Sequence, residues 1–183
     1  LRTNYMFENK YILEANVAYY GSPRFREGER YNLYPSFGAG WVLSEESFLK
    51  NSNWIDFLKL KGSWGIMGTT HNFTSYYSYR DIWNRSGGYS FGTGNGNNVS
   101  QVVNTNVGNP GLGWEESREF NLGMKGLFFS EQLLAEVNYF NELRSGILTQ
   151  LTGYYPGITG NWLPYENYEE VANQGLEATL SYT

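Results

Sequence analysis

The chain has 183 residues, enough for one ordinary domain, and it is rich in Tyr (16), Phe (11), Trp (6) and Gly (22). Its formal net charge of −5 gives no electrostatic case for a nucleic-acid partner, which would need clustered Lys and Arg. Cysteine is absent, which excludes disulfides, thiolate metal sites and a cysteine nucleophile, and no apolar run is long enough for a membrane-spanning helix.

Six segments show the same alternation, with an apolar side chain at every second position and mostly polar or small side chains between them. Successive residues of a strand point to opposite faces, so each segment predicts a β-strand with one apolar and one polar side. In chain order, the predicted strands lie near residues 11–20, 34–44, 58–66, 119–128, 133–139 and 176–182. Leu1 to Tyr5 fits the end of a further strand, and the chain stops inside the sixth, so we expect a segment of a longer protein.

The connections between these strands alternate in length. Long loops are predicted near residues 21–30, 68–116 and 149–172, the first of them only moderately long, and shorter turns near residues 45–53 and 129–132. Successive connections of antiparallel hairpins fall on opposite rims of a barrel. The long loops should therefore share one rim, and the short turns should share the other rim with Trp41 and Phe128 in its aromatic girdle.

These features together predict an all-β fold, an antiparallel transmembrane β-barrel segment with about six full strands, long extracellular loops and short periplasmic turns. Roughly nine to eleven residues per strand is the length that crosses a bilayer at a tilt. Strands of soluble proteins average about five or six residues, so a soluble secreted β-domain is the less favoured alternative.

The polar side of each predicted strand would face a water-filled lumen, where it would contact a plug, a solute or water. This lumen-facing set comprises Glu14, Asn16, Lys59, Lys61, Glu119, Asn121, Lys125, Glu136, Asn138 and Glu177.

Aromatic residues of the long loops are the candidate ligand contacts, because the apolar faces of sugar rings stack on aromatic rings. The candidates are Tyr76, Tyr79, Trp83 and Tyr89 in the longest loop, and Tyr154, Tyr155, Trp162 and Tyr165 in the last. The alternative is that these rings pack the loops against one another and against a partner that covers them.

No residue pattern predicts catalysis, so we expect that the protein is not an enzyme and needs no metal or cofactor. His71 is the only histidine, and it has no partner of catalytic type at a recognisable spacing. The adjacent carboxylates Glu45–Glu46 and Glu115–Glu116 are interpreted as solvated charges beside strands.

Five segments together resemble the SusC/RagA family of TonB-dependent outer-membrane transporters. They cover nearly the whole chain and follow the family's order: Tyr20–Phe25; Tyr34–Trp41 with Ser44–Leu49; Leu58–Gly65; Asn109–Glu115; and Asn173–Glu177. The first segment departs from the family's usual Asp-Gly-Ser-Ser-Arg-Phe form at Tyr20 and Pro23.

The resemblance implies a barrel of about 22 strands that encloses an N-terminal plug. Residues 1–183 would form part of its C-terminal barrel domain, with the plug and the TonB-contacting segment outside this chain. The resemblance further implies import of an oligosaccharide, or sometimes a peptide, across the outer membrane of a Bacteroidota bacterium. A SusD-like surface lipoprotein would deliver the solute, and TonB would supply the energy.

Two other functions remain open from the residues alone. One is a secreted or surface β-rich module that binds glycans through the aromatic loops without moving them. The other is a passive porin without a plug.

Overall fold

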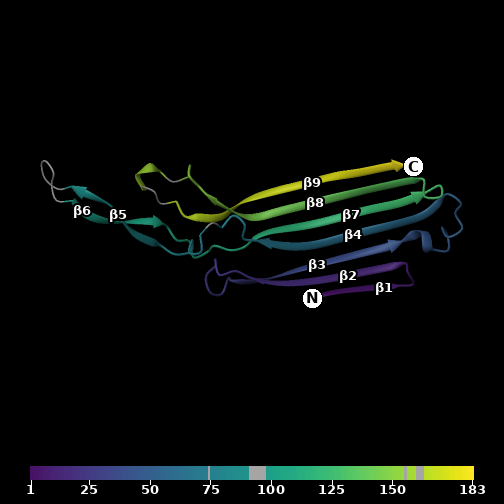
Figure 1. The fold of residues 1–183 in the computed structure, drawn as a ribbon, viewed down its shortest axis with the longest axis horizontal. Helices are drawn as coiled ribbons and strands as arrows, with labels where there is room; N and C mark the ends of the chain where they lie inside the picture. Colours follow the sequence, from purple (N-terminus) through teal and green to yellow (C-terminus); the bar gives the residue numbers. More distant parts are fainter. Residues whose placement is uncertain (74, 91–97, 155, 160–162) are drawn as a thin grey trace.

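The computed structural model is a single curved layer of long antiparallel strands with a hairpin projecting from one end (Figure 1). It describes residues 1–183 except residues 74, 91–97, 155 and 160–162. The strands are β1 (Arg2–Phe7), β2 (Tyr11–Gly21), β3 (Tyr31–Val42), β4 (Ile55–Thr69), β5 (Ile82–Ser90), β6 (Asn98–Asn106), β7 (Glu115–Phe128), β8 (Leu133–Gln150) and β9 (Tyr165–Tyr182). Short 3₁₀ turns lie at η1 (Leu43–Glu45) and η2 (Gly157–Thr159). No helix in the described part of the chain is long and apolar enough to cross a bilayer.

The large sheet has seven strands in the order β1-β2-β3-β4-β7-β8-β9, and every neighbouring pair is antiparallel. Figure 1 shows the long loops at one end of this sheet and the short turns at the other, as the sequence predicts. The predicted all-β fold, with six full strands and one partial strand, is confirmed. The sheet does not close on itself, so β1 and β9 each keep one edge that pairs with no described strand.

The strand register gives the sheet one polar and one largely apolar face. Glu14 pairs with Gly38, Gly38 with Ser63, and Ser63 with Asn121 across four strands. Directly paired residues point to the same face of a sheet, so these residues share a side. The opposite face carries rows such as Phe37, Trp64 and Phe120.

The apolar face leaves more apolar surface exposed than is favourable in water. Phe37 is 52% exposed, Trp64 41% and Leu176 75%. Contiguous exposed apolar surface of this size marks contact with lipid or protein. The six full strands contain 11 to 18 residues each, which is long enough to span hydrocarbon at a tilt.

Aromatic rings gather at both ends of the apolar face. Tyr11 stacks on Trp41 with centroids 6.3 Å apart at the short-turn end, and Tyr19 stacks on Tyr31 at 5.4 Å near the loops. Tyr19 lies eight positions after Tyr11 in β2. At a rise of about 3.3 Å per residue and a tilt of about 40°, the two girdles lie roughly 20 Å apart, close to the apolar band of a membrane barrel. Trp41 and Phe128 lie at the short-turn rim, as predicted.

The longest predicted loop differs from expectation, because residues 82–106 contain the hairpin β5–β6 rather than loop alone. Its strands have no regular apolar alternation, since polar and apolar residues stand on both sides and the register shifts twice. Strands β4, β8 and β9 also extend past the predicted loop boundaries, to Thr69, to Gln150 and from Tyr165.

Candidate functional site

The ten polar residues that the sequence assigns to a lumen share one face of the large sheet. Their register pairs connect them across six strands, from β2 to β9. They are Glu14, Asn16, Lys59, Lys61, Glu119, Asn121, Lys125, Glu136, Asn138 and Glu177. The structure thus gathers in one surface side chains that lie up to 163 positions apart in a chain of 183 residues.

A broad groove of about 590 Å³ lies on this polar face, over β2, β3, β4 and β7. Glu14, Asn16, Glu119 and Asn121 are among the residues that line it. Carboxylates accept hydrogen bonds and amides both donate and accept, so the groove can bind hydroxyl or amide groups of a ligand or of another protein segment.

An ion pair and hydrogen bonds from side-chain amides already engage part of the polar face. Lys61 forms an ion pair with Glu136 at 2.7 Å, reaching from β4 across β7 to β8. Asn138 donates to the same carboxylate at 3.2 Å, and Asn121 donates to Glu119 at 2.7 Å. These bonds hold the side chains against the wall of the sheet.

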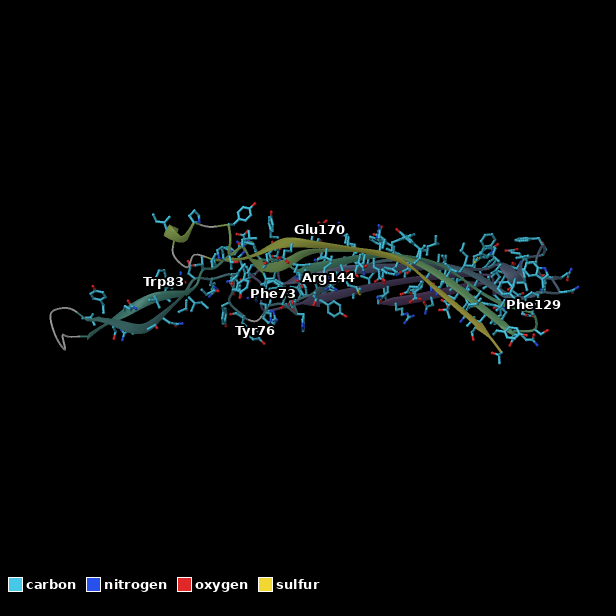
Figure 2. All side chains as sticks on the ribbon, turned by 90° about the horizontal axis from the view of Figure 1, so that it is seen from above. Phe73, Tyr76, Trp83, Phe129, Arg144 and Glu170 are labelled. Atoms are coloured by element: carbon cyan, nitrogen blue, oxygen red, sulfur yellow. The ribbon has the colours of Figure 1, made fainter. Side chains whose placement is uncertain are left out.

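The loop aromatics divide into packed and exposed groups. Tyr79 is only 8% exposed, and Tyr165 packs against other buried loop residues, so both contribute to loop packing. Tyr76, Trp83, Tyr89 and Tyr154 are at least 57% exposed and remain candidate ligand contacts. Figure 2 shows Trp83 on the hairpin, beyond the end of the large sheet. Tyr155 and Trp162 lie outside the described residues.

A compact cluster joins the three long loops, and we call it the loop core. Phe25, Phe73 and Leu112 are each at most 1% exposed, and Trp114, Leu148 and Tyr165 pack around them. The Phe25 ring meets Phe73 edge-on and Trp114 at a tilt, each at a centroid distance of 5.0 Å. The first two loops contribute residues to the loop core, and the ends of β8 and β9 that flank the third loop pack against it.

Polar bonds reinforce the loop core. The Arg24 guanidinium donates to the carbonyls of Thr70, at 2.8 Å, and Phe73. Glu115 is 1% exposed and accepts from the Asn72 amide at 2.6 Å and the Leu148 N–H at 3.3 Å. A buried carboxylate is stable only with such partners, so Glu115 is a structural residue of the rim rather than a solvated charge.

Asparagines connect the longest loop to the loop-side ends of β8 and β9. Asn109 donates to the carbonyl of Tyr165 at 2.8 Å. The Asn167 side chain both accepts from the Gly113 N–H, at 2.8 Å, and donates to the carbonyls of Gly113 and Gly146. The sequence identifies the Asn109–Glu115 segment only as a family-like motif. These hydrogen bonds show its physical role, which is to attach the longest loop to the start of β9.

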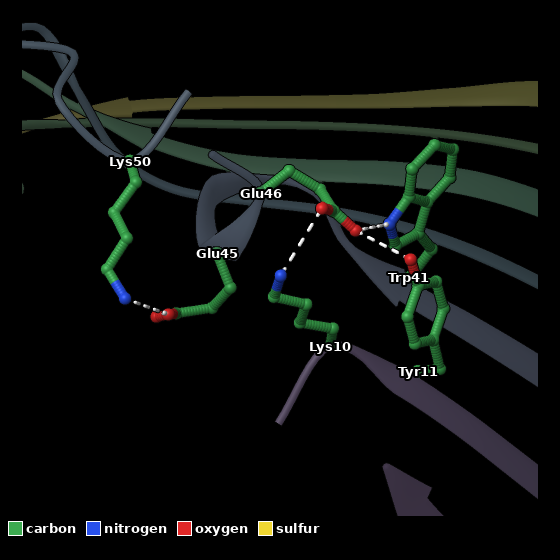
Figure 3. A network of polar contacts seen from close by, with 6 residues as sticks. All are labelled: Lys10, Tyr11, Trp41, Glu45, Glu46 and Lys50. Atoms are coloured by element: carbon green, nitrogen blue, oxygen red, sulfur yellow. Dashed lines mark hydrogen bonds and ion pairs between the residues drawn. The ribbon is translucent and has the colours of Figure 1, made fainter. Parts of the chain in front are cut away.

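The short-turn rim contains a second polar network, centred on Glu46 (Figure 3). Its carboxylate accepts from the Tyr11 hydroxyl at 2.7 Å, the Trp41 indole N–H at 3.1 Å and the Lys10 ammonium at 3.3 Å. These donors, the Tyr11 hydroxyl first among them, hold the pKa of Glu46 below its ordinary value. Glu46 thereby fixes two rings of the aromatic girdle.

A known protein family matches most of this chain. The family described as "TonB dependent receptor-like, beta-barrel" matches residues 19–183. The chain belongs to this family. Membership of this family accounts for the features of both rims. A barrel wall needs aromatic rings at its membrane boundaries and an organised set of loops at its outer opening.

Curated relatives agree over nearly the whole chain. TonB-dependent receptor P26 of Formosa agariphila is 28% identical over 182 residues, covering 100% of this chain and 18% of the relative. TonB-dependent receptor SusC of Bacteroides thetaiotaomicron is 27% identical over 183 residues, covering 98% of this chain and 18% of SusC. The chain therefore spans less than a fifth of the length of these relatives.

Solved structures show the same arrangement of strands. The RagAB peptide transporter matches with a TM-score of 0.82 and 26% identity, over 98% of this chain and 19% of that one. The siderophore receptor PirA of Pseudomonas aeruginosa matches with a TM-score of 0.61 and 19% identity, over 98% of this chain and 29% of PirA, which supports the fold alone. The resemblance to SusC and RagA that the sequence motifs indicate is confirmed.

Proposed function

We propose that this chain is part of the barrel wall of an outer-membrane importer that takes up nutrient solutes. The observation that carries the proposal is the register, which places ten polar side chains on one face of long strands and girdle aromatics on the other. A wall of this kind separates a water-filled lumen from lipid. Membership of the TonB-dependent receptor-like β-barrel family supports energy coupling through TonB.

Within this function, we assign an oligosaccharide as the first candidate solute and a peptide as the second. The exposed rings of Tyr76, Trp83, Tyr89 and Tyr154 at the loop rim favour sugar stacking. A peptide is favoured by the likeness to the RagAB peptide transporter. The same two relatives, SusC and RagAB, support a SusD-like lipoprotein partner and a Bacteroidota outer membrane. The proposal includes no catalytic step, and His71 is exposed in the turn after β4.

The test uses the full-length protein in its own outer membrane. Cells with and without the gene are given fluorescent oligosaccharides and fluorescent peptides, each with and without a protonophore that collapses the proton gradient. We expect the gene to be required for uptake of one of these classes, and the protonophore to abolish that uptake. Detergent extraction followed by mass spectrometry of the intact complex should show a lipoprotein partner.

Other outcomes would identify the alternative functions. Gene-dependent uptake that persists with the protonophore would indicate a passive porin. A water-soluble protein that binds glycan and is recovered alone would identify the secreted or surface binding module and contradict the importer.

A further inference from the structure

The groove on the polar face lies where two neighbouring strands part. Strands β3 and β4 pair only up to Ser36 and Gly65, although both continue further toward the loops. Pro35, directly before Ser36, has no N–H to donate to a neighbouring strand. Beyond it, the Tyr34 ring fills the position that a Cβ of Gly68 would occupy. The groove extends from the paired part of β3 and β4 to this gap.

Small residues form the floor of the groove. They are Ser36 and Gly38 of β3 and Ser63 and Gly65 of β4. A Cβ at Gly38 would meet no heavy atom closer than 3.7 Å, so packing within the described chain does not require glycine there. Glycine in a strand interior permits a ligand to approach the backbone closely. The volume of about 590 Å³ lies in the range of small-molecule sites, about 300–1,000 Å³.

The polar groups that border this floor repeat with a local two-fold symmetry. A half-turn about the normal to the sheet exchanges two register rows, each with one Glu, one Asn, one Ser and one Gly in opposite order. The rows are Asn16–Ser36–Gly65–Glu119 and Glu14–Gly38–Ser63–Asn121. Strands β2 and β7 lie three strand spacings apart, roughly 14 Å. An elongated ligand would therefore meet a carboxylate and an amide on both sides of the floor.

The groove is rich in hydrogen-bond acceptors, and its described lining contains no Lys, Arg or His. Glu14 forms an ion pair with Arg2 at 2.7 Å. Glu119 accepts from the Asn121 amide at 2.7 Å, and no cation of the described residues lies at salt-bridge distance from it. Carboxylates accept hydrogen bonds from hydroxyl groups, whereas they repel anions. The groove therefore favours a ligand that donates hydrogen bonds and has no negative charge.

A buried hydroxyl at the loop end of the groove points to a polar ligand. Tyr34 lines the groove and is only 3% exposed. Its hydroxyl has no hydrogen-bond partner within the described residues. A buried polar group without a partner is costly, so such a group calls for a ligand or water that satisfies it.

We propose that the groove binds a short run of uncharged sugar rings, and that Glu119 excludes oligosaccharides with carboxylate or sulfate groups. The inference rests on the proposed function, which places this face in the lumen, and it names the class of solute that the wall accepts. Sugar hydroxyls donate to the carboxylates of Glu14 and Glu119, and the Tyr34 hydroxyl binds a sugar oxygen. The groove lies on the half of the wall nearest the loops, where a solute enters.

The test measures which solutes the full-length protein removes from the medium. Cells with and without the gene receive a mixture of neutral and acidic oligosaccharides of matched length, and separately a mixture of peptides, each with and without a protonophore. Mass spectrometry of the medium identifies the depleted species. We expect gene-dependent, protonophore-sensitive depletion of neutral oligosaccharides, with the acidic ones left behind.

The first variant tests the charge of the groove. Glu119→Gln keeps an acceptor oxygen but removes the negative charge, so acidic oligosaccharides should be depleted at least about tenfold faster than by wild type. The matched control is Glu170→Gln, on β9 and outside the lining of the groove (Figure 2). The control should exclude acidic oligosaccharides as wild type does.

The second variant tests whether the groove is occupied. In Gly38→Phe the new ring would fill the floor, so the concentration of neutral oligosaccharide needed for half-maximal uptake should rise about tenfold. Thr179→Phe is the control, because it places the same ring on the polar face, opposite Glu136 and outside the groove. Heat-dependent mobility on electrophoresis reports that every variant forms a barrel.

Failure of the proposed function and failure of this inference are distinguishable. Where no solute is depleted in a gene-dependent manner, the proposed function itself fails. In an assembled barrel that imports a solute, depletion of acidic oligosaccharides by wild type, or of peptides alone, would overturn this inference only. Continued exclusion of acidic oligosaccharides by Glu119→Gln, or wild-type uptake by Gly38→Phe, would also overturn it.

Discussion

Single residues decide how the wall is anchored at its short-turn rim, and Glu46 is the clearest case. It lies outside the strands yet binds side chains from β2, from β3 and from the turn between β1 and β2. Tyr and Trp rings prefer membrane interfaces because one end is apolar and the other is polar. Glu46 satisfies the polar ends of Tyr11 and Trp41, so their apolar parts can face lipid.

The Glu46 network makes a pH-dependent contribution to stability. Because the folded protein lowers the pKa of Glu46, this contribution is complete above the ordinary value of 4.5 and is lost as the pH falls through the lowered value. We expect Glu46→Gln to lower the thermal unfolding midpoint of the detergent-solubilised full-length protein at pH 7. The difference from wild type should shrink as the pH falls below 4.5, as measured by tryptophan fluorescence.

The matched control is Glu45→Gln, the neighbouring carboxylate. Among the described residues, Glu45 pairs only with Lys50, at 3.6 Å, and both side chains are well exposed. Exposed ion pairs of this kind contribute little, so the control should unfold as wild type does at both pH values. Equal effects of the two substitutions would contradict a special role for Glu46.

At the scale of elements, the hairpin β5–β6 depends on close packing at its base. A two-stranded hairpin is marginally stable by itself in water, so its attachment matters. Gly108 follows β6, and its N–H donates to the Asp81 carboxylate at 2.9 Å. Asn106 donates to the carbonyl of Arg80 at 2.7 Å, so the two ends of the hairpin are bound together.

Gly108→Ala should loosen this base. The new Cβ would stand 2.3 Å from the carbonyl carbon of Arg80 and 2.6 Å from the amide nitrogen of Asp81, which are backbone atoms that can move only with the chain. Overpacking of this kind costs about 1–3 kcal/mol, so we expect protease cleavage between residues 82 and 106 on intact cells to become about tenfold faster.

Gly113→Ala is the control in the same loop, because its added Cβ would meet nothing within 4 Å. Cleavage in this variant should match wild type, and the unfolding midpoint of the barrel should be unchanged in both variants. Unchanged cleavage in Gly108→Ala would show that the hairpin base is not closely packed in the membrane.

At the scale of the whole molecule, the sheet is incomplete as a membrane structure. Strands β1 and β9 each leave one edge unpaired, and the apolar face has no cover within the described chain. Unpaired edges and exposed apolar faces promote association between copies. The wall is therefore stable only as part of a closed barrel in lipid or detergent.

We therefore predict that residues 1–183, produced alone in aqueous buffer, aggregate. Size-exclusion chromatography should show material in the void volume, and thermal unfolding should show no cooperative transition. The full-length protein in detergent is the control and should be monodisperse. A monodisperse, cooperatively folding soluble fragment would contradict the assignment of this sheet to a membrane barrel.

The loops show where prediction from the sequence stopped. The loop core depends on contacts between residues far apart in sequence, such as Arg24 with Thr70 and Asn109 with Tyr165. Phe25 and Leu112 lie in two of the segments that resemble the SusC/RagA family, yet no local pattern shows that these segments contact each other. The hairpin β5–β6 was missed because most of its described side chains are exposed on both faces, so no apolar alternation marks its strands.

The sequence by itself determined the six full strands, their polar and apolar faces, the two rims and the resemblance to SusC and RagA. Alternation is a local property, and lipid on one side with water on the other imposes it on every strand. Only the tertiary structure decided that Lys59 opposes Lys125, that Glu46 binds Tyr11 and Trp41, and that two loops share one core with the ends of β8 and β9. These features depend on strand register and on loop contacts, which join residues that no short pattern relates.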